Sequence, residues 1–187
     1  MYSYDFHKSI ESEEQPQAAK LAEFIQNHYN PSVFLDFGAS SGLYVREIKQ
    51  RMPSIESIGY EFSEDAVKNA LCSDIVLTDL TNPLDRVKKD NTVGICLEVL
   101  EHISEDDWKP VLQNISKLCD VIFFSAAVPG QGGTGHINCR WKIDWIRRFN
   151  KLGWVVDLDM TRNVIREMET TRHMGWFLNN IVVFVKS

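Results

Sequence analysis

Short apolar runs alternate with amphipathic segments along most of this chain, and turn residues separate them. A strand of a parallel sheet is covered on both faces, so it reads as a continuous apolar run rather than as a strict alternation. Helix patterns fill most of the intervals between the apolar runs, which predicts an α/β fold. We place seven strands at about residues 33–37, 57–62, 75–79, 92–98, 121–128, 154–158 and 180–186.

The helix patterns carry apolar residues three and four positions apart. The first runs from Glu14 to Tyr29 and stops at Asn30-Pro31. Residues 1–13 have no clear pattern, and we expect either a frayed tail or a flap over a site. Further helices are expected to begin near residues 43, 64, 104, 141 and 163.

The expected architecture is a three-layer, Rossmann-like fold with a mostly parallel seven-stranded sheet. No clear long crossover helix separates the last two strands, so we expect the last strand to pair antiparallel at an edge. Asn179-Asn180 is then interpreted as an edge-strand feature. Trp141 and Trp145 lie four positions apart, and we expect them to pack in the core. Residues 1–187 are predicted to form a single domain.

Composition narrows the class of protein without identifying it. The 187 residues are 44% hydrophobic and 25% charged, as in ordinary globular proteins. A net charge of −6 disfavours a nucleic-acid partner, because phosphate contacts need clustered Lys and Arg. The four cysteines form no CxxC pair and are expected to be reduced. Neither a signal peptide nor an apolar run of roughly 20 residues is present, so we expect a cytoplasmic protein without a membrane partner.

The stretch Val33–Gly42 carries the first sign of function. It reads as a buried strand and a glycine-containing turn, and a helix follows. In open α/β sheets, ligands bind beyond the carboxyl ends of the strands. Acidic residues stand at three further strand ends, namely Glu61, Asp79 and Glu98. The pattern therefore predicts a ligand-binding crevice along this edge of the sheet.

The chain resembles class I S-adenosylmethionine-dependent methyltransferases from about Glu14 to the last strand. Asp36-Phe37-Gly38-Ala39-Ser40-Ser41-Gly42 is similar to the acid-x-Gly-x-Gly-x-Gly motif of that family, with Ser40 in place of the central glycine. Glu61 stands where the family has its ribose-binding acid, and Asp79-Leu80 resembles the pair that brackets the adenine. Leu97–Ile103 is close to the strand-four motif of small-molecule and sugar methyltransferases.

This resemblance implies S-adenosylmethionine as the cofactor. An Asp36 carboxylate can bind the ammonium of its methionine end, and Glu61 can accept hydrogen bonds from the ribose hydroxyls. Backbone amides of the turn can meet its carboxylate. The cofactor-binding residues are then expected to be Asp36, Gly38, Ala39, Ser40, Gly42, Glu61, Asp79, Leu80 and Glu98.

His102 and His136 are the candidate catalytic residues. A neutral imidazole can deprotonate or orient an alcohol or amine acceptor near pH 7. Glu98, Glu101, His102 and His136 also resemble the metal site of small-RNA 3′-terminal 2′-O-methyltransferases, and the first three resemble that of ubiquinone-biosynthesis O-methyltransferases. A divalent metal is possible with these residues but is not favoured, because the E-x-x-E-H string also occurs in relatives that need no metal.

The favoured function is methyl transfer to a small molecule or saccharide, with oxygen as the acceptor atom. One alternative is a catalytically silent module that binds S-adenosylmethionine and regulates a partner. Another is a metal-assisted RNA 2′-O-methyltransferase. A remote alternative is an α/β-hydrolase, because Gly38–Gly42 also matches G-x-S-x-G with Ser40 as nucleophile; Asp79 or Asp157 and then His136 follow in the required order.

Overall fold

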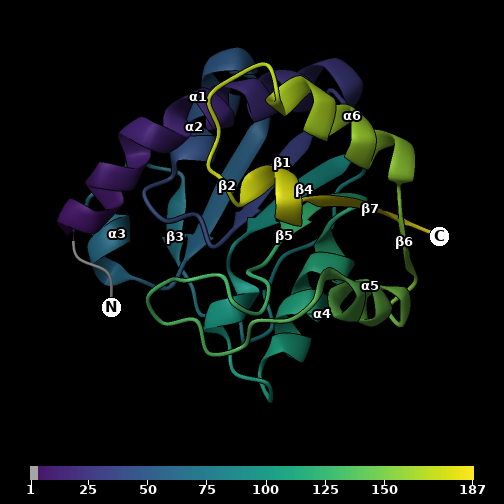
Figure 1. Ribbon diagram of the computed structural model, residues 1–187. Coiled ribbons are helices and arrows are strands. Elements are labelled where there is room, and N and C mark those ends of the chain that lie inside the picture. The colour runs from purple at the N-terminus through teal and green to yellow at the C-terminus, as the bar shows by residue number, and fades with distance from the viewer. Residues whose placement is uncertain (1–3) are drawn as a thin grey trace.

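The computed structural model describes the backbone of residues 4–187 and the side chains from residue 11 onward. Its centre is a seven-stranded sheet with the strand order β3-β2-β1-β4-β5-β7-β6, which lies between two layers of helices in Figure 1. The three-layer α/β prediction is confirmed. The strands are β1 (Val33–Phe37), β2 (Glu56–Glu61), β3 (Ile75–Leu77), β4 (Thr92–Leu97), β5 (Val121–Ser125), β6 (Trp154–Val156) and β7 (Val182–Lys186).

Helices cover both faces of the sheet. In Figure 1, α1, α2 and α6 lie above the sheet, and α4 and α5 lie below it. A short 3-10 helix, η1 (Leu100–His102), follows β4. The helices are α1 (Tyr4–His28), α2 (Leu43–Arg51), α3 (Glu64–Lys68), α4 (Trp108–Leu118), α5 (Lys142–Asn150), α6 (Leu158–Met168) and α7 (Phe177–Asn180).

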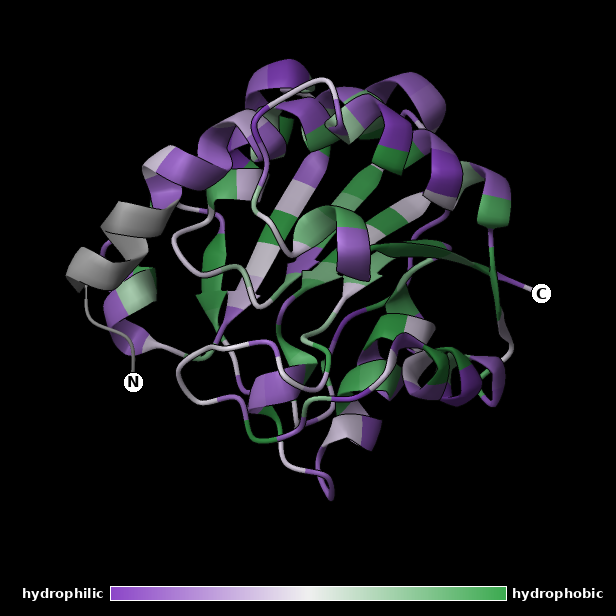
Figure 2. Ribbon diagram, in the orientation of Figure 1, coloured by the Kyte–Doolittle hydropathy of each residue, from purple (hydrophilic) through white to green (hydrophobic). Residues whose placement is uncertain are grey.

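Two apolar cores result, one on each face of the sheet. Phe24, Phe34 and Phe123 belong to the core beneath α1, α2 and α6. Phe37, Phe124 and Trp145 belong to the core beneath α4 and α5. The adjacent Phe123 and Phe124 of β5 enter opposite cores, and so do Phe34 and Phe37 of β1, which lie three positions apart; this is the two-residue period of a strand buried on both faces. Figure 2 shows the strands mostly apolar and the outer faces of the helices polar.

The last strand is antiparallel, as predicted, but it does not lie at an edge. β7 pairs with β5 through Val121↔Val185 and with β6 through Val155↔Val185, both antiparallel. The edge prediction was therefore wrong. β7 carries Val182, Val183 and Phe184, all buried, whereas β6 leaves Val155 44% exposed. The more apolar strand takes the interior position, and the short β6 forms the edge.

The first helix is longer than the sequence pattern predicted. It begins at Tyr4 rather than near Glu14, so most of residues 1–13 form helix and not a frayed tail; residues 1–3 lie outside the described residues. Pro16 lies inside this helix. Proline favours the first turn of a helix and costs stability in its interior, which is why the pattern alone suggests a later start.

Trp141 was wrongly assigned to the core. Trp145 of α5 is 1% exposed and packs into the core between that helix and the sheet. Trp141 is the N-cap of α5 and is 59% exposed. Ile143, two residues further along the chain, is also about half exposed. The helix begins one residue after Trp141, so the four-residue spacing places only Trp145 toward the sheet.

All four cysteines are free thiols in the structure. Among the described helices, none is both long enough and apolar enough to cross a membrane.

Candidate functional site

The turn after β1 has a backbone that few residue types accept. Gly38, Ser40 and Gly42 all have positive φ, at 93°, 49° and 79°. A Cβ on Gly38 would lie 2.4 Å from Cγ2 of Val99, so both the dihedral angle and the available space require glycine there. Ser40 occupies the left-handed region at the position where the methyltransferase motif has glycine. The turn keeps a shape accessible to glycine even though a serine side chain is present.

Glu61, at the end of β2, binds this turn directly. Its Oε2 accepts a hydrogen bond from the Ser40 amide at 2.7 Å, and its Oε1 accepts one from the Ser63 amide at 2.7 Å. The Gly38 and Ala39 amides both donate to the Tyr60 carbonyl at 2.9 Å. The ends of β1 and β2 are thereby held together, with a carboxylate between them.

A hollow opens beside the turn, between α1, β1 and β4. Asp36 faces it and is 3% exposed, yet its Oδ2 has no hydrogen-bond partner among the described residues. Burial, and then the nearby negative charges of Glu61 and Glu14, raise the pKa of Asp36 well above its usual value. An orphaned buried carboxylate of this kind fits a cationic ligand. The hollow is lined by Glu11, Glu14, Asp36, Gly38, Ala39, Ser40, Ser41, Leu43, Tyr44, Ile95 and Leu97.

Five of the predicted cofactor-binding residues do not line this hollow, namely Gly42, Glu61, Asp79, Leu80 and Glu98. Gly42 packs against Ile75, where an added Cβ would approach the Ile75 side chain to 2.7 Å. The Asp79 carboxylate accepts hydrogen bonds from Thr81 and Asn82 of its own loop. The Leu80 side chain is buried in the core beneath α4.

Glu98 belongs to a polar network across the sheet edge. Its Oε2 accepts a 2.6 Å hydrogen bond from Gln131 Nε2, and its Oε1 accepts one of 3.1 Å from Asn180 Nδ2. Asn180 Nδ2 also donates to Gln131 Oε1 at 2.8 Å. The glycine-rich loop, Pro129–His136, is thus tied to the residue that follows β4 and to α7. Asn180 is 3% exposed and belongs to this network, so its interpretation as an edge-strand feature was wrong.

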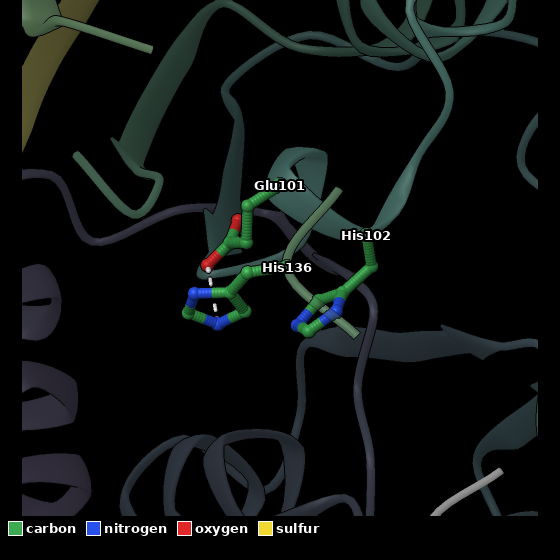
Figure 3. A group of neighbouring side chains, drawn as sticks. All are labelled: Glu101, His102 and His136. Carbon is green, nitrogen blue, oxygen red and sulfur yellow. Dashed lines mark ion pairs between the residues drawn. The ribbon is translucent and has the colours of Figure 1, made fainter. Parts of the chain in front are cut away.

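The two candidate catalytic histidines lie together. The ring centroids of His102 and His136 are 5.0 Å apart, and Figure 3 shows both rings on the same side of Glu101. His102 Nδ1 lies 3.1 Å from the Gly135 carbonyl, and His136 Nδ1 lies 3.3 Å from the Gln131 carbonyl. The loop before His136 therefore positions both imidazoles.

Glu101 completes the cluster. It is fully buried, neither carboxylate oxygen has a hydrogen-bond partner among the described residues, and His136 Nε2 lies 4.0 Å from Oε1. Burial, and next the Glu98 carboxylate, raise the pKa of Glu101 to about 8. Burial lowers the pKa of His102. Near neutral pH these shifts favour a neutral His102 imidazole and a protonated Glu101.

The same three side chains can hold a metal ion. One ligand atom from each of Glu101, His102 and His136 lies within 4.8 Å of the others. Imidazole and carboxylate together suit Zn²⁺ and Mn²⁺. Glu98, the fourth residue of the set considered from sequence, uses its carboxylate for Gln131 and Asn180 instead.

The two aspartates that the hydrolase alternative needs, Asp79 and Asp157, both form local capping hydrogen bonds instead. Asp79 bonds its own loop, and Asp157 Oδ1 accepts a hydrogen bond from the Met160 amide as the N-cap of α6. β1 is also the first strand of the described residues, so no earlier strand is available to supply an oxyanion hole. In the part of the chain that the structure describes, both candidate aspartates are therefore engaged in local caps and not in a triad.

Comparisons with solved structures define the class of fold, which is that of S-adenosylmethionine-dependent methyltransferases. The O-methyltransferase of a trans-AT polyketide synthase from Brevibacillus brevis, solved with S-adenosylhomocysteine, is 16% identical with a TM-score of 0.66, over 98% of this chain and 76% of its own. The magnesium protoporphyrin IX methyltransferase of Synechocystis PCC 6803 is 16% identical with a TM-score of 0.68, over 100% and 89%.

The small RNA methyltransferase HEN1 has the same fold, at 14% identity and a TM-score of 0.62, over 91% of this chain and 26% of its own. No protein-family profile and no curated protein matches the sequence. The seven-stranded Rossmann-like architecture expected from the sequence is the one these structures share.

Several residues at the site were missed by the sequence interpretation. Glu14 and Tyr44 line the hollow, and Gln131 and Asn180 hold Glu98. Glu14 and Tyr44 carry no motif, and each sits in a helix whose apolar stripe drew attention instead. The only sequence signal for Asn180 was its polar side chain next to the apolar last strand. A polar side chain that becomes buried there needs hydrogen-bond partners, which Glu98 and Gln131 supply.

Proposed function

We propose that this protein is an S-adenosylmethionine-dependent methyltransferase that acts on a small molecule or saccharide, with oxygen as the acceptor atom. The observation that carries the proposal is the pair of carboxylates around the turn. Asp36 is buried beside the hollow and its Oδ2 has no hydrogen-bond partner among the described residues, and Glu61 is held at the end of the neighbouring strand by two backbone amides. The shared fold supports the same cofactor.

The residues present fit that cofactor. The orphaned Oδ2 of Asp36 suits an ammonium group, and the ordered Glu61 carboxylate suits two vicinal ribose hydroxyls. The strained turn offers a close backbone approach. Asp79, Leu80 and Glu98 remain proposed cofactor contacts by resemblance only. When bound, the cofactor supplies a methyl group on a sulfonium centre.

His102 and His136 are proposed to orient and deprotonate the acceptor. Their rings are adjacent, and the glycine-rich loop carries the second of them. A neutral imidazole at His102 can accept the hydroxyl proton. A stronger base is not needed, because positioning and the exclusion of water can supply much of the rate enhancement of methyl transfer.

A divalent ion at Glu101, His102 and His136 is the competing arrangement. It is favoured by the convergence of three ligand atoms within 4.8 Å and by the unpartnered Glu101 carboxylate. These residues would hold the ion, which would acidify an acceptor hydroxyl. A small RNA is then the alternative acceptor, in line with the fold shared with HEN1.

Calorimetric titration with S-adenosylmethionine and S-adenosylhomocysteine, with and without Mg²⁺, Mn²⁺ or Zn²⁺, tests the proposal. We expect binding of both nucleosides without metal. If neither binds, the proposed function is wrong. Metal binding that is lost in His136→Ala but kept in Asp106→Asn, a control at an exposed position, would favour the metal arrangement.

Methyl transfer to candidate acceptors separates the remaining alternatives. Turnover of a small hydroxylated acceptor supports the proposal, and turnover of RNA alone supports the RNA alternative. A protein that binds the cofactor tightly but transfers no methyl group to either acceptor class would be the silent module. Full turnover in both His102→Ala and His136→Ala would remove the role proposed for the two histidines.

A further inference from the structure

The hollow beside Asp36 has a second acidic wall, which comes from the N-terminal helix. Glu11 and Glu14 of α1 line it opposite the β1 turn. Glu14 is partly buried, and its Oε1 lies 3.4 Å from the Tyr44 hydroxyl. Two carboxylates, Asp36 and Glu14, thus approach one space from different elements.

Glu14 is held in place by a chain of hydrogen bonds. The Met174 amide donates to Gln17 Oε1 at 2.8 Å, and Gln17 Nε2 donates to the Tyr44 hydroxyl at 2.6 Å. The Tyr44 hydroxyl in turn donates to Glu14. Gln17 is fully buried and Tyr44 is 8% exposed, so this chain fixes the carboxylate from behind and leaves it directed at the hollow.

The charges around Glu14 leave the hollow negative. Asp36 of β1 and Glu11 of α1 line the hollow together with Glu14, and the negative charges of Glu61 and Glu98, outside its lining, act on Asp36 and Glu14 respectively. Arg46 of α2 forms ion pairs with Glu11 at 3.7 Å and with Glu47 at 2.9 Å, and not with Asp36 or Glu14. Among the described residues, neither Asp36 nor Glu14 forms an ion pair with a basic side chain.

We propose that Glu14 is a cofactor-binding residue that, together with Asp36, encloses the ammonium group of the cofactor's amino-acid end between two carboxylates. This inference rests on the proposed function. A single buried cation beside two carboxylates neutralises the charge of one of them and donates hydrogen bonds to both, since an ammonium has three donors. The unpartnered Asp36 oxygen and the tethered Glu14 carboxylate supply the two acceptors.

Proton release is the measurable consequence. Burial raises the pKa of Glu14 to about 7, with a further contribution from the charge of Glu98, and burial also raises the pKa of Asp36 well above its usual value. In the empty site below pH 7, Glu14 therefore holds a proton. An arriving ammonium favours the carboxylate, and the proton passes to the buffer. Affinity should rise with pH up to about 7.

Calorimetry at pH 6 in buffers of different ionisation enthalpy counts the protons. We expect Glu14→Gln to bind S-adenosylhomocysteine at least about tenfold more weakly than the unchanged protein, the scale of one charged hydrogen bond. It should release about one proton fewer per ligand, because Gln does not titrate. Glu13→Gln, an exposed neighbour on the same helix, is the matched control and should change neither quantity.

A truncated ligand separates an ammonium contact from a general effect on the helix. 5′-Methylthioadenosine has the nucleoside but no amino-acid end, so Glu14→Gln should bind it as the unchanged protein does. Equal weakening for both ligands, or unchanged proton release, would overturn the inference. If the unchanged protein binds neither ligand, the proposed function fails instead; binding of S-adenosylhomocysteine that is indifferent to Glu14→Gln overturns this inference alone.

Discussion

The Glu61 carboxylate binds the Ser40 amide at 2.7 Å, so the end of β2 is joined directly to the turn that follows β1. Its other oxygen binds the Ser63 amide at the same distance. The contact orders both the carboxylate and a strained turn, because Ser40 has a φ of 49°. A residue proposed to bind ribose is therefore also a residue on which the shape of the turn depends.

Replacing Glu61 should affect stability and binding together. Glu61→Ala removes two hydrogen bonds to a carboxylate and should lower the free energy of unfolding by about 2 kcal/mol. Binding of S-adenosylhomocysteine should weaken by at least about tenfold. Urea denaturation and calorimetry measure the two effects. Glu64→Gln, an exposed carboxylate three residues further on, serves as control, and equal losses in both variants would refute the assigned role.

Gly38 should not tolerate a side chain. Gly38→Ala places a Cβ 2.4 Å from Val99 and at a φ of 93°, so it should cost about 3 kcal/mol in unfolding free energy, part from the clash and part from the dihedral angle. Adding Val99→Ala should recover the steric part only. A double-mutant cycle by urea denaturation checks this. Additive losses would show that Val99 is not the source of the clash.

The sequence predicts the sheet and the strand ends more reliably than what packs over them. The β1 turn and Glu61 could be located because strand-end chemistry follows chain order in an α/β fold. Whether β7 or β6 occupies the edge depends on pairing energies among three strands, which no local pattern encodes. The long α1 was obscured by Pro16, and with it the approach of Glu14 to Asp36.

Contacts between loops were the other limit. His102 and His136 could be proposed individually as candidates, but their 5.0 Å separation depends on the path of a glycine-rich loop. That path depends in turn on Gln131, which reaches Glu98 and Asn180 from distant parts of the chain. Such long-range polar pairing has no periodicity along the sequence, so spacing alone could not predict it.

The stability of the ligand-free protein should fall as the pH rises from about 4.5 to 7. The pKa of Glu14 is about 7 in the folded protein against 4.5 as its ordinary value, so the folded state binds more protons in this window. Asp36 and Glu101, whose pKa values are also raised in the folded protein, act with the same sign. The carboxyls whose pKa is lowered, Glu56, Glu105 and Asp120, lose their stabilisation only as pH falls below their ordinary values.

Thermal melts across this pH range measure the effect. Glu14→Gln should flatten the decline, whereas Glu13→Gln should leave it unchanged because that side chain is exposed. A decline of the same slope in Glu14→Gln would mean that the titration belongs to other groups. Since the melts contain no ligand, this result tests the burial of Glu14 independently of any cofactor.

The network of Glu98, Gln131 and Asn180 should control the glycine-rich loop. Asn180→Ala removes both donated hydrogen bonds, at 3.1 Å to Glu98 and 2.8 Å to Gln131, and leaves the carboxylate with one of its two side-chain partners. The loop should open more often, because its attachment to α7 is lost. Hydrogen exchange at the Gln131 amide, which donates to the Val128 carbonyl at 3.0 Å, reports this opening.

We expect exchange at Gln131 to become about tenfold faster in Asn180→Ala, the scale of one lost buried hydrogen bond. Asn179→Ala is the matched control, because Asn179 is the exposed neighbour on the same short helix. Amides of β4 should keep their protection in both variants, which separates loop opening from global unfolding. Equal rates at Gln131 in the two variants would show that the loop is held by its own backbone turn and not by α7. In that case His136 would be positioned by the loop alone, and its place beside His102 would owe nothing to Asn180.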